Sequence, residues 1–240
     1  MFEFILIFIA FAVGLSFFIW INKPSKPTGN RAHVSQDTPP KSRVKATNHP
    51  NSSIASHEIL LAAEMAFNTG DYGLAVKKFM DLAEQGNADA QNALGLLYTF
   101  DQGIQQDYEK AAFWFLKAAK QGHAESQYRL ANAFKNGHGV PQNYNQAFTW
   151  CRAAAEQRLP LAEFFLGSLY YLGQGVSQDH EQAVFWFRKA AEQGLADAQF
   201  QLGSAYNRGD GVAQDQTQGA FWMRKAAAQG HFLARTSLAS

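Results

Sequence analysis

The sequence predicts an all-α solenoid of stacked helical hairpins, preceded by a single transmembrane helix and a disordered linker. Three observations predict this organisation. A 36-residue pattern recurs four times, without insertion or deletion, between residues 87 and 230. An uncharged apolar run occupies residues 4–21. Between these two parts, residues 23–56 combine prolines and basic residues with very few large apolar side chains.

Residues 1–22 contain the predicted membrane anchor. As a helix, the run at 4–21 would be about 27 Å long, close to the ~30 Å thickness of a bilayer core. It also lacks the polar stripe of a globular core helix. A cleaved signal peptide is the alternative. Against that alternative, no Lys or Arg precedes the run, the run exceeds the usual signal-peptide core, and no A-x-A cleavage site follows.

The charges that flank this span predict its orientation. No Lys or Arg precedes it, whereas Lys23, Lys26, Arg31 and Lys41 follow it. Because basic residues favour the cytoplasmic side, we expect a single-pass membrane protein whose C-terminal domain is cytoplasmic. The periplasmic orientation is the alternative.

Residues 23–56 form the predicted linker. They hold five of the seven prolines, six basic residues and one acid, Asp37. Such a segment cannot bury a core, so we expect it to be disordered and, as a flexible coil, to reach about 35 Å. The remainder, residues 57–240, has fifteen basic and eighteen acidic residues. This mild acidity gives no electrostatic case for nucleic acid binding.

The decisive observation is the internal repeat, whose copies span residues 87–122, 123–158, 159–194 and 195–230. Residues of several types recur every 36 positions: Trp114, Trp150, Trp186 and Trp222; Leu94, Leu130, Leu166 and Leu202; Gly103, Gly139, Gly175 and Gly211. Because one hairpin cannot bury both of its faces, the copies are expected to gain their stability by stacking.

Each copy is predicted to contain two helices, at about 88–100 and 108–120 in the first copy. Ala90, Leu94 and Tyr98 share one face of the first helix. The second helix has an apolar stripe that includes Ala111 and Phe115, with the tryptophan beside it. We expect the tryptophans to fill the space between hairpins.

The ends of the second helices carry recognisable capping residues. The predicted N-caps are Asp107, Asn143, Asp179 and Asp215. In three copies Gln follows three residues later, as in a capping box, at Gln146, Gln182 and Gln218. The predicted helix-ending glycines are Gly122, Gly194 and Gly230. Arg158 replaces this glycine in the second copy and Pro160 follows, which predicts a junction that bends differently.

Small residues inside the first helices predict close packing. They are Gly95, Ala131, Gly167 and Gly203. Glycine in a helix interior costs about 1 kcal/mol relative to alanine. Its recurrence there therefore indicates that the neighbouring helix approaches closely.

Two further segments extend the stack. Residues 57–86 are expected to form a helix pair that starts it, because Asp71, Tyr72 and Ala75 precede their counterparts in the first copy by 36 residues. Residues 231–240 begin one more first helix and are expected to form a C-terminal cap.

The repeat pattern A-x-A-Q-x-x-L-G-x-x-Y-x-x-G-x-G-V-x-x-D-x-x-x-A-x-x-W-x-x-K-A-A-x-Q-G resembles the Sel1-like repeat, a relative of the tetratricopeptide repeat. The resemblance covers residues 87–230, and residues 57–86 resemble a tetratricopeptide-like hairpin. It is fullest in the fourth copy, at Ala196, Ala198, Gln199, Leu202, Gly203, Tyr206, Gly209, Gly211, Val212, Asp215, Trp222, Lys225, Ala226, Ala227, Gln229 and Gly230. Asp101 departs from it at the first turn glycine. The resemblance implies a right-handed α/α superhelix with an inner groove, used as an adaptor or scaffold.

No residue pattern supports catalysis, a cofactor or a metal site, so we expect a protein that is not an enzyme. Cys151 occupies the position of Phe115, Phe187 and Met223 and is interpreted as a small core residue. The G-x-G turns lack the third glycine and the preceding strand of a phosphate loop, which favours a structural role. His123 and His231 share one repeat position, which indicates a surface or inter-repeat hydrogen bond.

The predicted partner-binding groove follows the first helices. By similarity to tetratricopeptide repeats, we expect the first-helix positions that vary between copies to face the groove. They are Asn92, Leu96, Thr99, Tyr128, Asn132, Lys135, Phe164, Ser168, Tyr171, Phe200, Ser204 and Asn207. Tyr128, Phe164 and Phe200 would form a ladder of aromatic rings suited to a peptide or extended segment. The alternative is that these rings pack between neighbouring hairpins.

Together these observations predict a membrane-tethered adaptor that binds a protein partner in its inner groove, without a small-molecule cofactor. The alternative is a periplasmic cell-envelope protein that binds polysaccharide or peptidoglycan-associated machinery. That alternative requires the opposite membrane topology.

Overall fold

The structure is a computed structural model that describes residues 50–100 and 104–239. Every regular element in this part of the chain is a helix. The helices are α1 (Pro50–Asn68), α2 (Tyr72–Glu84), α3 (Ala88–Thr99), α4 (Tyr108–Lys120), α5 (Ala124–Asn136), α6 (Tyr144–Glu156), α7 (Pro160–Leu172), α8 (His180–Glu192), α9 (Ala196–Arg208), α10 (Gln216–Ala228) and α11 (Phe232–Ala239). The predicted membrane span at 4–21 and most of the predicted linker lie outside the described residues.

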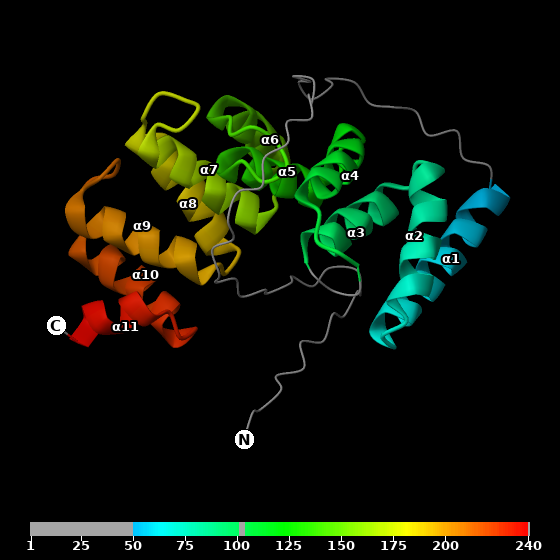
Figure 1. Cartoon of the computed structure of the whole chain (residues 1–240). Coiled ribbons are helices and arrows are strands. Elements are labelled where there is room, and N and C mark those ends of the chain that lie inside the picture. The colour runs from blue at the N-terminus through cyan, green and yellow to red at the C-terminus, as the bar shows by residue number, and fades with distance from the viewer. Residues whose placement is uncertain (1–49, 101–103, 240) are drawn as a thin grey trace.

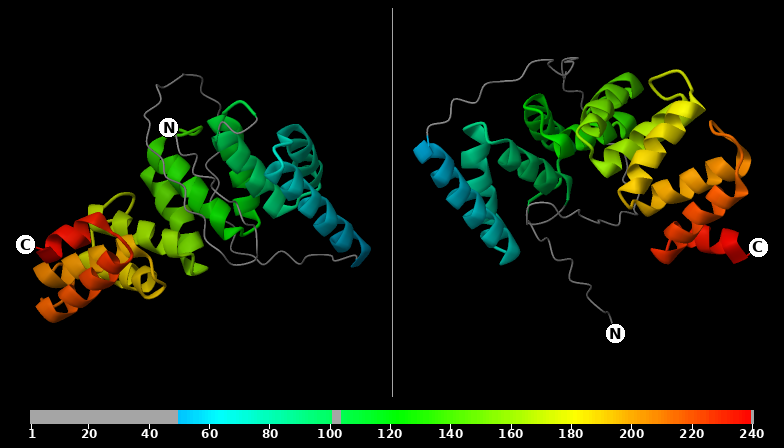
Figure 2. Two further views of the ribbon diagram at one scale, coloured as in Figure 1. Left: turned by 90° about the horizontal axis from the view of Figure 1, so that it is seen from below. Right: turned by 180° about the vertical axis from the view of Figure 1, so that it is seen from behind.

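Each helix packs mainly against its neighbours in the sequence, and the packing is most extensive within a hairpin. Figure 1 shows the resulting stack, which runs in an arc from α1 and α2 at one end to α11 at the other. The two views of Figure 2 show the same separation of the ends. The predicted all-α solenoid is therefore confirmed, and the helix bounds of the first copy agree with the expected ones to within one residue. None of the described helices is both long and apolar enough to cross a membrane.

The start of α1 corrects the predicted linker boundary. Residues 50–56 were expected to be disordered, but the helix begins at Pro50. Proline suits the first turn of a helix because its missing N–H would have no intrahelical partner there. The residues that follow, Ser52, Ser53, Ile54 and Ala55, contain no helix breaker.

The interior of the stack is continuous across hairpins. Leu94, Leu130, Leu166 and Leu202 are fully buried, as are most of the paired alanines. Trp114 of α4 packs in one cluster with residues of α1, α2 and α3, and Trp222 of α10 packs with residues of α8 and α9. The tryptophans thus fill the space between hairpins, as expected.

Close helix approach at the small first-helix residues is also confirmed. A Cβ atom added to Gly167 of α7 would lie 2.7 Å from the Phe187 ring of α8, which is too close for carbon atoms. Gly95 faces Phe115 in the same way. In the second hairpin Ala131 replaces glycine, and the side chain at the facing position is the smaller Cys151, which is completely buried. The interpretation of Cys151 as a small core residue is therefore confirmed.

The G-x-G turns join the two helices of a hairpin and also contact the hairpin before it. Gly137 ends α5 in the left-handed conformation, with φ of 72°. Gly139 also has φ of 72°, and a Cβ there would overlap the backbone carbonyl of Tyr108 at the start of α4. Gly175 and Gly211 meet the preceding second helix in the same manner. These glycines therefore have the structural role that the sequence favoured.

The predicted N-caps are confirmed, whereas the capping-box prediction needs correction. The N-cap side chains accept from the third helical N–H, as expected. In a capping box the later Gln would accept from the N-cap N–H, but here that N–H donates to a first-helix carbonyl instead, at 2.8–3.0 Å. Arg158 also adopts the left-handed conformation, with φ of 66°. Its N–H donates to Ala155 O at 2.9 Å, as Gly122 N–H does to Ala119 O, so Arg158 keeps the backbone conformation of the glycine that it replaces. A different bend at this junction stays a prediction.

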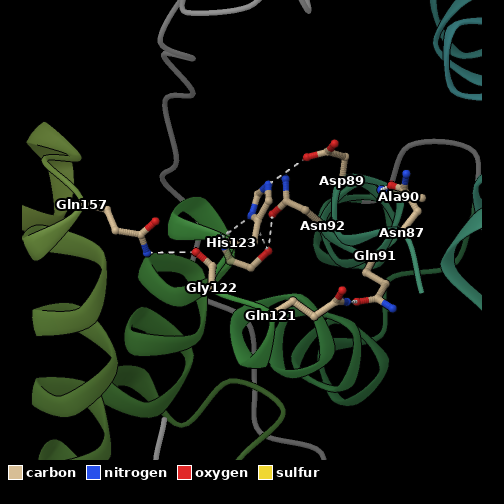
Figure 3. Close-up of polar contacts among 10 residues, drawn as sticks. Asn87, Asp89, Ala90, Gln91, Asn92, Gln121, Gly122, His123 and Gln157 are labelled. Atoms are coloured by element: carbon tan, nitrogen blue, oxygen red, sulfur yellow. Dashed lines mark hydrogen bonds and ion pairs between the residues drawn. The ribbon is translucent and has the colours of Figure 1, made fainter. Parts of the chain in front are cut away.

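A buried ladder of glutamines fixes the register between hairpins. The side-chain nitrogen of Gln91 on α3 donates to Ala83 O at the end of α2, at 3.0 Å. Its side-chain oxygen accepts from Gln121 at the end of α4, at 2.8 Å (Figure 3). Gln127 and Gln199 make the same two kinds of bond in later copies. Each ladder glutamine thus joins three helices from two hairpins.

Glu163 occupies the ladder position in the third copy. It is 1% exposed and accepts from Gln193 at 2.7 Å. A carboxylate has no proton to donate to the carbonyl at the end of α6, where the glutamines donate in other copies. Burial raises the pKa of Glu163, and the hydrogen bond from Gln193 opposes this effect.

We predict that Glu163→Gln stabilises the chain at pH 7 by about 1 kcal/mol, the net value of one added hydrogen bond. The raised pKa means that the native state favours the protonated acid, so the wild type gains stability below the ordinary Glu pKa and loses it as pH rises through the native value. The advantage of the variant should therefore shrink towards pH 4. Urea unfolding at several pH values measures the difference in the free energy of unfolding between the variant and the wild type. A difference that does not change with pH would contradict the prediction.

Candidate binding surface

The predicted groove residues lie on the four first helices α3, α5, α7 and α9. Two of them are buried, because Asn92 is 6% exposed and Ser204 is 9% exposed. The other ten are partly exposed. The position of Asn92 corrects its assignment to the groove: its side-chain oxygen accepts from Ser126 Oγ of α5 at 2.8 Å, which places it between hairpins.

The three rings of the predicted aromatic ladder each contact another helix. Tyr128 of α5 meets Phe165 of α7 edge to face, with 6.2 Å between ring centroids. Phe164 lies 5.6 Å from Phe187 of α8, and Phe200 of α9 stacks on His231 at 4.6 Å. The contacts of Tyr128 and Phe200 match the alternative in which the rings pack between neighbouring hairpins, whereas Phe164 packs against the second helix of its own hairpin. A further role of their exposed edges in partner binding stays a prediction.

The polar members of the set bind mostly to their own helices. Asn132 donates to Tyr128 O at 3.1 Å, and Ser168 donates to Phe164 O at 3.0 Å. Thr99 donates to Gly95 O at 2.8 Å. Among the remaining residues, Leu96 packs against the core and the Oδ1 atom of Asn207 is buried without a hydrogen-bond donor. The face therefore offers few free polar groups, and aromatic and aliphatic surface makes up much of what it presents.

Cations lie over several rings of this face. Lys135 of α5 is 5.1 Å from the centre of the Phe165 ring, and Arg129 is 5.9 Å from that of Tyr128. Arg129 also pairs with Glu125 at 2.7 Å, whereas Lys135 has no ion pair with a described residue. Tyr171 lies beside His180, at 4.8 Å. The central part of the face thus combines the partly exposed rings of Tyr128 and Tyr171 with an unneutralised ammonium group, a chemistry suited to a peptide chain.

The two repeat-matched histidines make inter-repeat contacts, as the sequence indicated. The Nδ1 atom of His123 accepts from Ser126 N–H at 3.1 Å and caps α5, while its Nε2 atom lies 3.3 Å from Asp89 of α3 (Figure 3). The hydrogen bond from His123 is the main cause that lowers the pKa of Asp89. His231 makes the equivalent contacts with α11 and Asp197. Among the described residues, no cluster of His, Cys, Asp and Glu could hold a metal ion.

The buried thiol offers no accessible nucleophile. The sulfur of Cys151 lies 3.3 Å from Ala162 O, and burial raises the pKa of the thiol well above its usual value. The thiol therefore stays protonated at neutral pH, unlike that of a catalytic cysteine.

Sequence reasoning missed a row of exposed aromatic side chains on the second helices. Phe113, Phe185 and Phe221 are 44–49% exposed, and each precedes a repeat tryptophan. In each case a lysine four residues later lies about as near to the phenylalanine as to the tryptophan, at 4.6–5.2 Å from the ring centres. The sequence could have predicted this row. The residue before each tryptophan falls on the side of the second helix that is opposite to the helix's apolar stripe, so a phenylalanine there is expected to be exposed.

Comparison with known proteins gives one family and several similar structures. A family model described as Sel1 repeat matches residues 88–123, 124–159, 160–195 and 196–231, one residue later than the predicted copies. A Sel1 repeat protein from Oxalobacter formigenes is 33% identical, with a TM-score of 0.67 over 71% of this chain and 70% of that chain. No curated protein matches.

Two further structures are similar to this chain. A protective antigen present in uropathogenic Escherichia coli strains, which displays an SLR fold, is 40% identical with a TM-score of 0.66 over 68% of this chain. The match spans 35% of the length of that antigen. A sel1 repeat protein from Klebsiella pneumoniae is 21% identical with a TM-score of 0.51, over 78% of this chain and 94% of that chain, a likeness of fold alone.

Proposed function

This chain belongs to the Sel1 repeat family, and on that premise we propose that it is a membrane-tethered adaptor whose first-helix face binds an extended segment of a protein partner. Sel1 repeat proteins are in general non-enzymatic scaffolds for protein–protein interaction. The proposal for this chain places the contact on α5, α7 and α9, which carry partly exposed aromatic rings and, on α5, Lys135.

One observation carries the proposal. The interior positions of the first helices repeat, whereas the neighbouring positions differ between copies and, apart from Asn92 and Ser204, remain partly exposed. Packing explains the constancy of the interior, and it leaves the outward positions free to differ. A surface that varies over a constant scaffold is the arrangement that lets a solenoid recognise one particular partner.

We predict that the double variant Lys135→Glu and Tyr171→Ala lowers partner capture by about tenfold, equivalent to ~1.4 kcal/mol of binding free energy. Both side chains are partly exposed and lie outside the buried core, so helical circular dichroism should be unchanged. The measurement is affinity purification of the full chain from solubilised membranes after crosslinking in cells, with quantitative mass spectrometry.

The matched control is Arg152→Glu with Phe185→Ala, on the second helices of the same two hairpins. These positions are exposed, and the substitutions are of the same chemical types. The control should capture partners as the wild type does. Equal capture by all three proteins, or a loss confined to the control, would rule out the first-helix face.

The tether and its orientation are part of the same proposal. The apolar run at 4–21 supports a membrane anchor, and the lysines and arginines after it support a cytoplasmic solenoid. We expect a green fluorescent protein fused after Ser240 to fluoresce in membrane-bound form, and alkaline phosphatase at the same position to be inactive. Active phosphatase there would reject this orientation and favour a periplasmic solenoid.

A further inference from the structure

The two ends of the stack expose apolar side chains. At the first end, Leu61 and Met65 stand one turn apart on α1 and are 51% and 62% exposed. At the other end, Phe232, Leu233 and Leu238 of α11 are 74%, 52% and 43% exposed. Figures 1 and 2 show α1 and α11 as the outermost helices of the arc, on opposite sides of the molecule. In a solenoid, polar residues normally cover such end faces.

Leu238 shows what kind of surface α11 presents. It stands 36 residues after Leu202, at the repeat position where the four earlier leucines are fully buried under the following second helix. In α11 the same side chain is 43% exposed. Among the described residues, α11 therefore exposes a position that is buried in α3, α5, α7 and α9.

The two ends also carry opposite charge. Residues 57–84, in α1 and α2, contain five acidic residues and two lysines, a net charge of −3. Residues 216–239, in α10 and α11, contain Arg224, Lys225 and Arg235 and no acid, a net charge of +3. None of these ten charged side chains forms an ion pair with a described residue.

From these observations we infer that the α11 end of one copy docks on the α1 end of a second copy, head to tail. Such contact brings apolar surface against apolar surface and unpaired basic residues towards unpaired acidic ones. Docking of an end on the same end of another copy would set like charges against each other. The contact is heterologous, so it leaves one free end on each side and extends to a chain of copies along the membrane.

The test uses two full-length variants with different tags, Met65→Cys and Leu238→Cys, expressed together and treated in membranes with a bismaleimide crosslinker. Both side chains are exposed, so the substitutions do not disturb the core, and the native Cys151 is buried. We expect dimers that carry both tags, at about ten times the yield of either variant expressed alone. In the matched control, a Leu172→Cys variant takes the place of one of the two cysteine variants. Leu172 is 57% exposed, and it lies on α7, remote from both ends of the stack.

Three results would overturn the inference: dimers of Met65→Cys alone at equal yield, dimers of Leu238→Cys alone at equal yield, or mixed dimers no more abundant than with Leu172→Cys. A charge test supplies a second readout. Arg224→Glu with Arg235→Glu in the Leu238→Cys copy should reduce mixed dimers severalfold, and Glu58→Lys with Glu64→Lys in the other copy should restore them. Failure of this restoration would show that charge does not orient the copies. Both readouts are independent of the partner-binding face, because neither end includes Lys135 or Tyr171.

Discussion

The close contact between the two helices of each hairpin is the constraint on which the rest of the structure depends. A residue without a side chain, or with only a methyl group, lies on the first helix opposite a larger side chain on the second. The pairs are Gly95 and Phe115, Ala131 and Cys151, Gly167 and Phe187, and Gly203 and Met223. Where the small residue gains a methyl group, the facing side chain shrinks from phenylalanine to cysteine. The volume shared by the two positions is therefore limited, as close packing requires.

This contact determines how the hairpins stack and which surfaces they display. With the two helices held close, each glutamine of the ladder reaches the ends of two second helices, and Gly139 lies against the carbonyl of Tyr108. The glutamine bonds recur at a spacing of 36 residues wherever the ladder residue is glutamine, so similar contacts join successive hairpins. The outward side chains of α5, α7 and α9 consequently lie in one series, and the two end faces are left without a neighbouring hairpin.

The sequence alone predicted the helix pairs, the N-caps, the small-residue contacts and the buried Cys151, because each depends on a local pattern or on a residue's place in the period. It did not predict which atoms would meet. The period places Asn92 on the first helix, but its burial depends on Ser126 of the next hairpin. The capping-box prediction failed for Gln146 because the N–H of Asn143 donates to Phe134 O, a bond that depends on the path of the loop. The rings of Tyr128, Phe164 and Phe200 likewise found partners on other helices, which a one-dimensional pattern cannot locate.

The most direct measurement of the central constraint is a double-mutant cycle at Gly167 and Phe187, followed by urea unfolding. Alanine normally stabilises a helix interior by about 1 kcal/mol relative to glycine. Here Gly167→Ala should destabilise by about 1–3 kcal/mol, because its Cβ would overlap the Phe187 ring. Combining it with Phe187→Cys reproduces the natural Ala131 and Cys151 pair, so the double variant should be more stable than the sum of the single changes by about 1 kcal/mol or more. Strictly additive changes, or stabilisation by Gly167→Ala alone, would contradict the account.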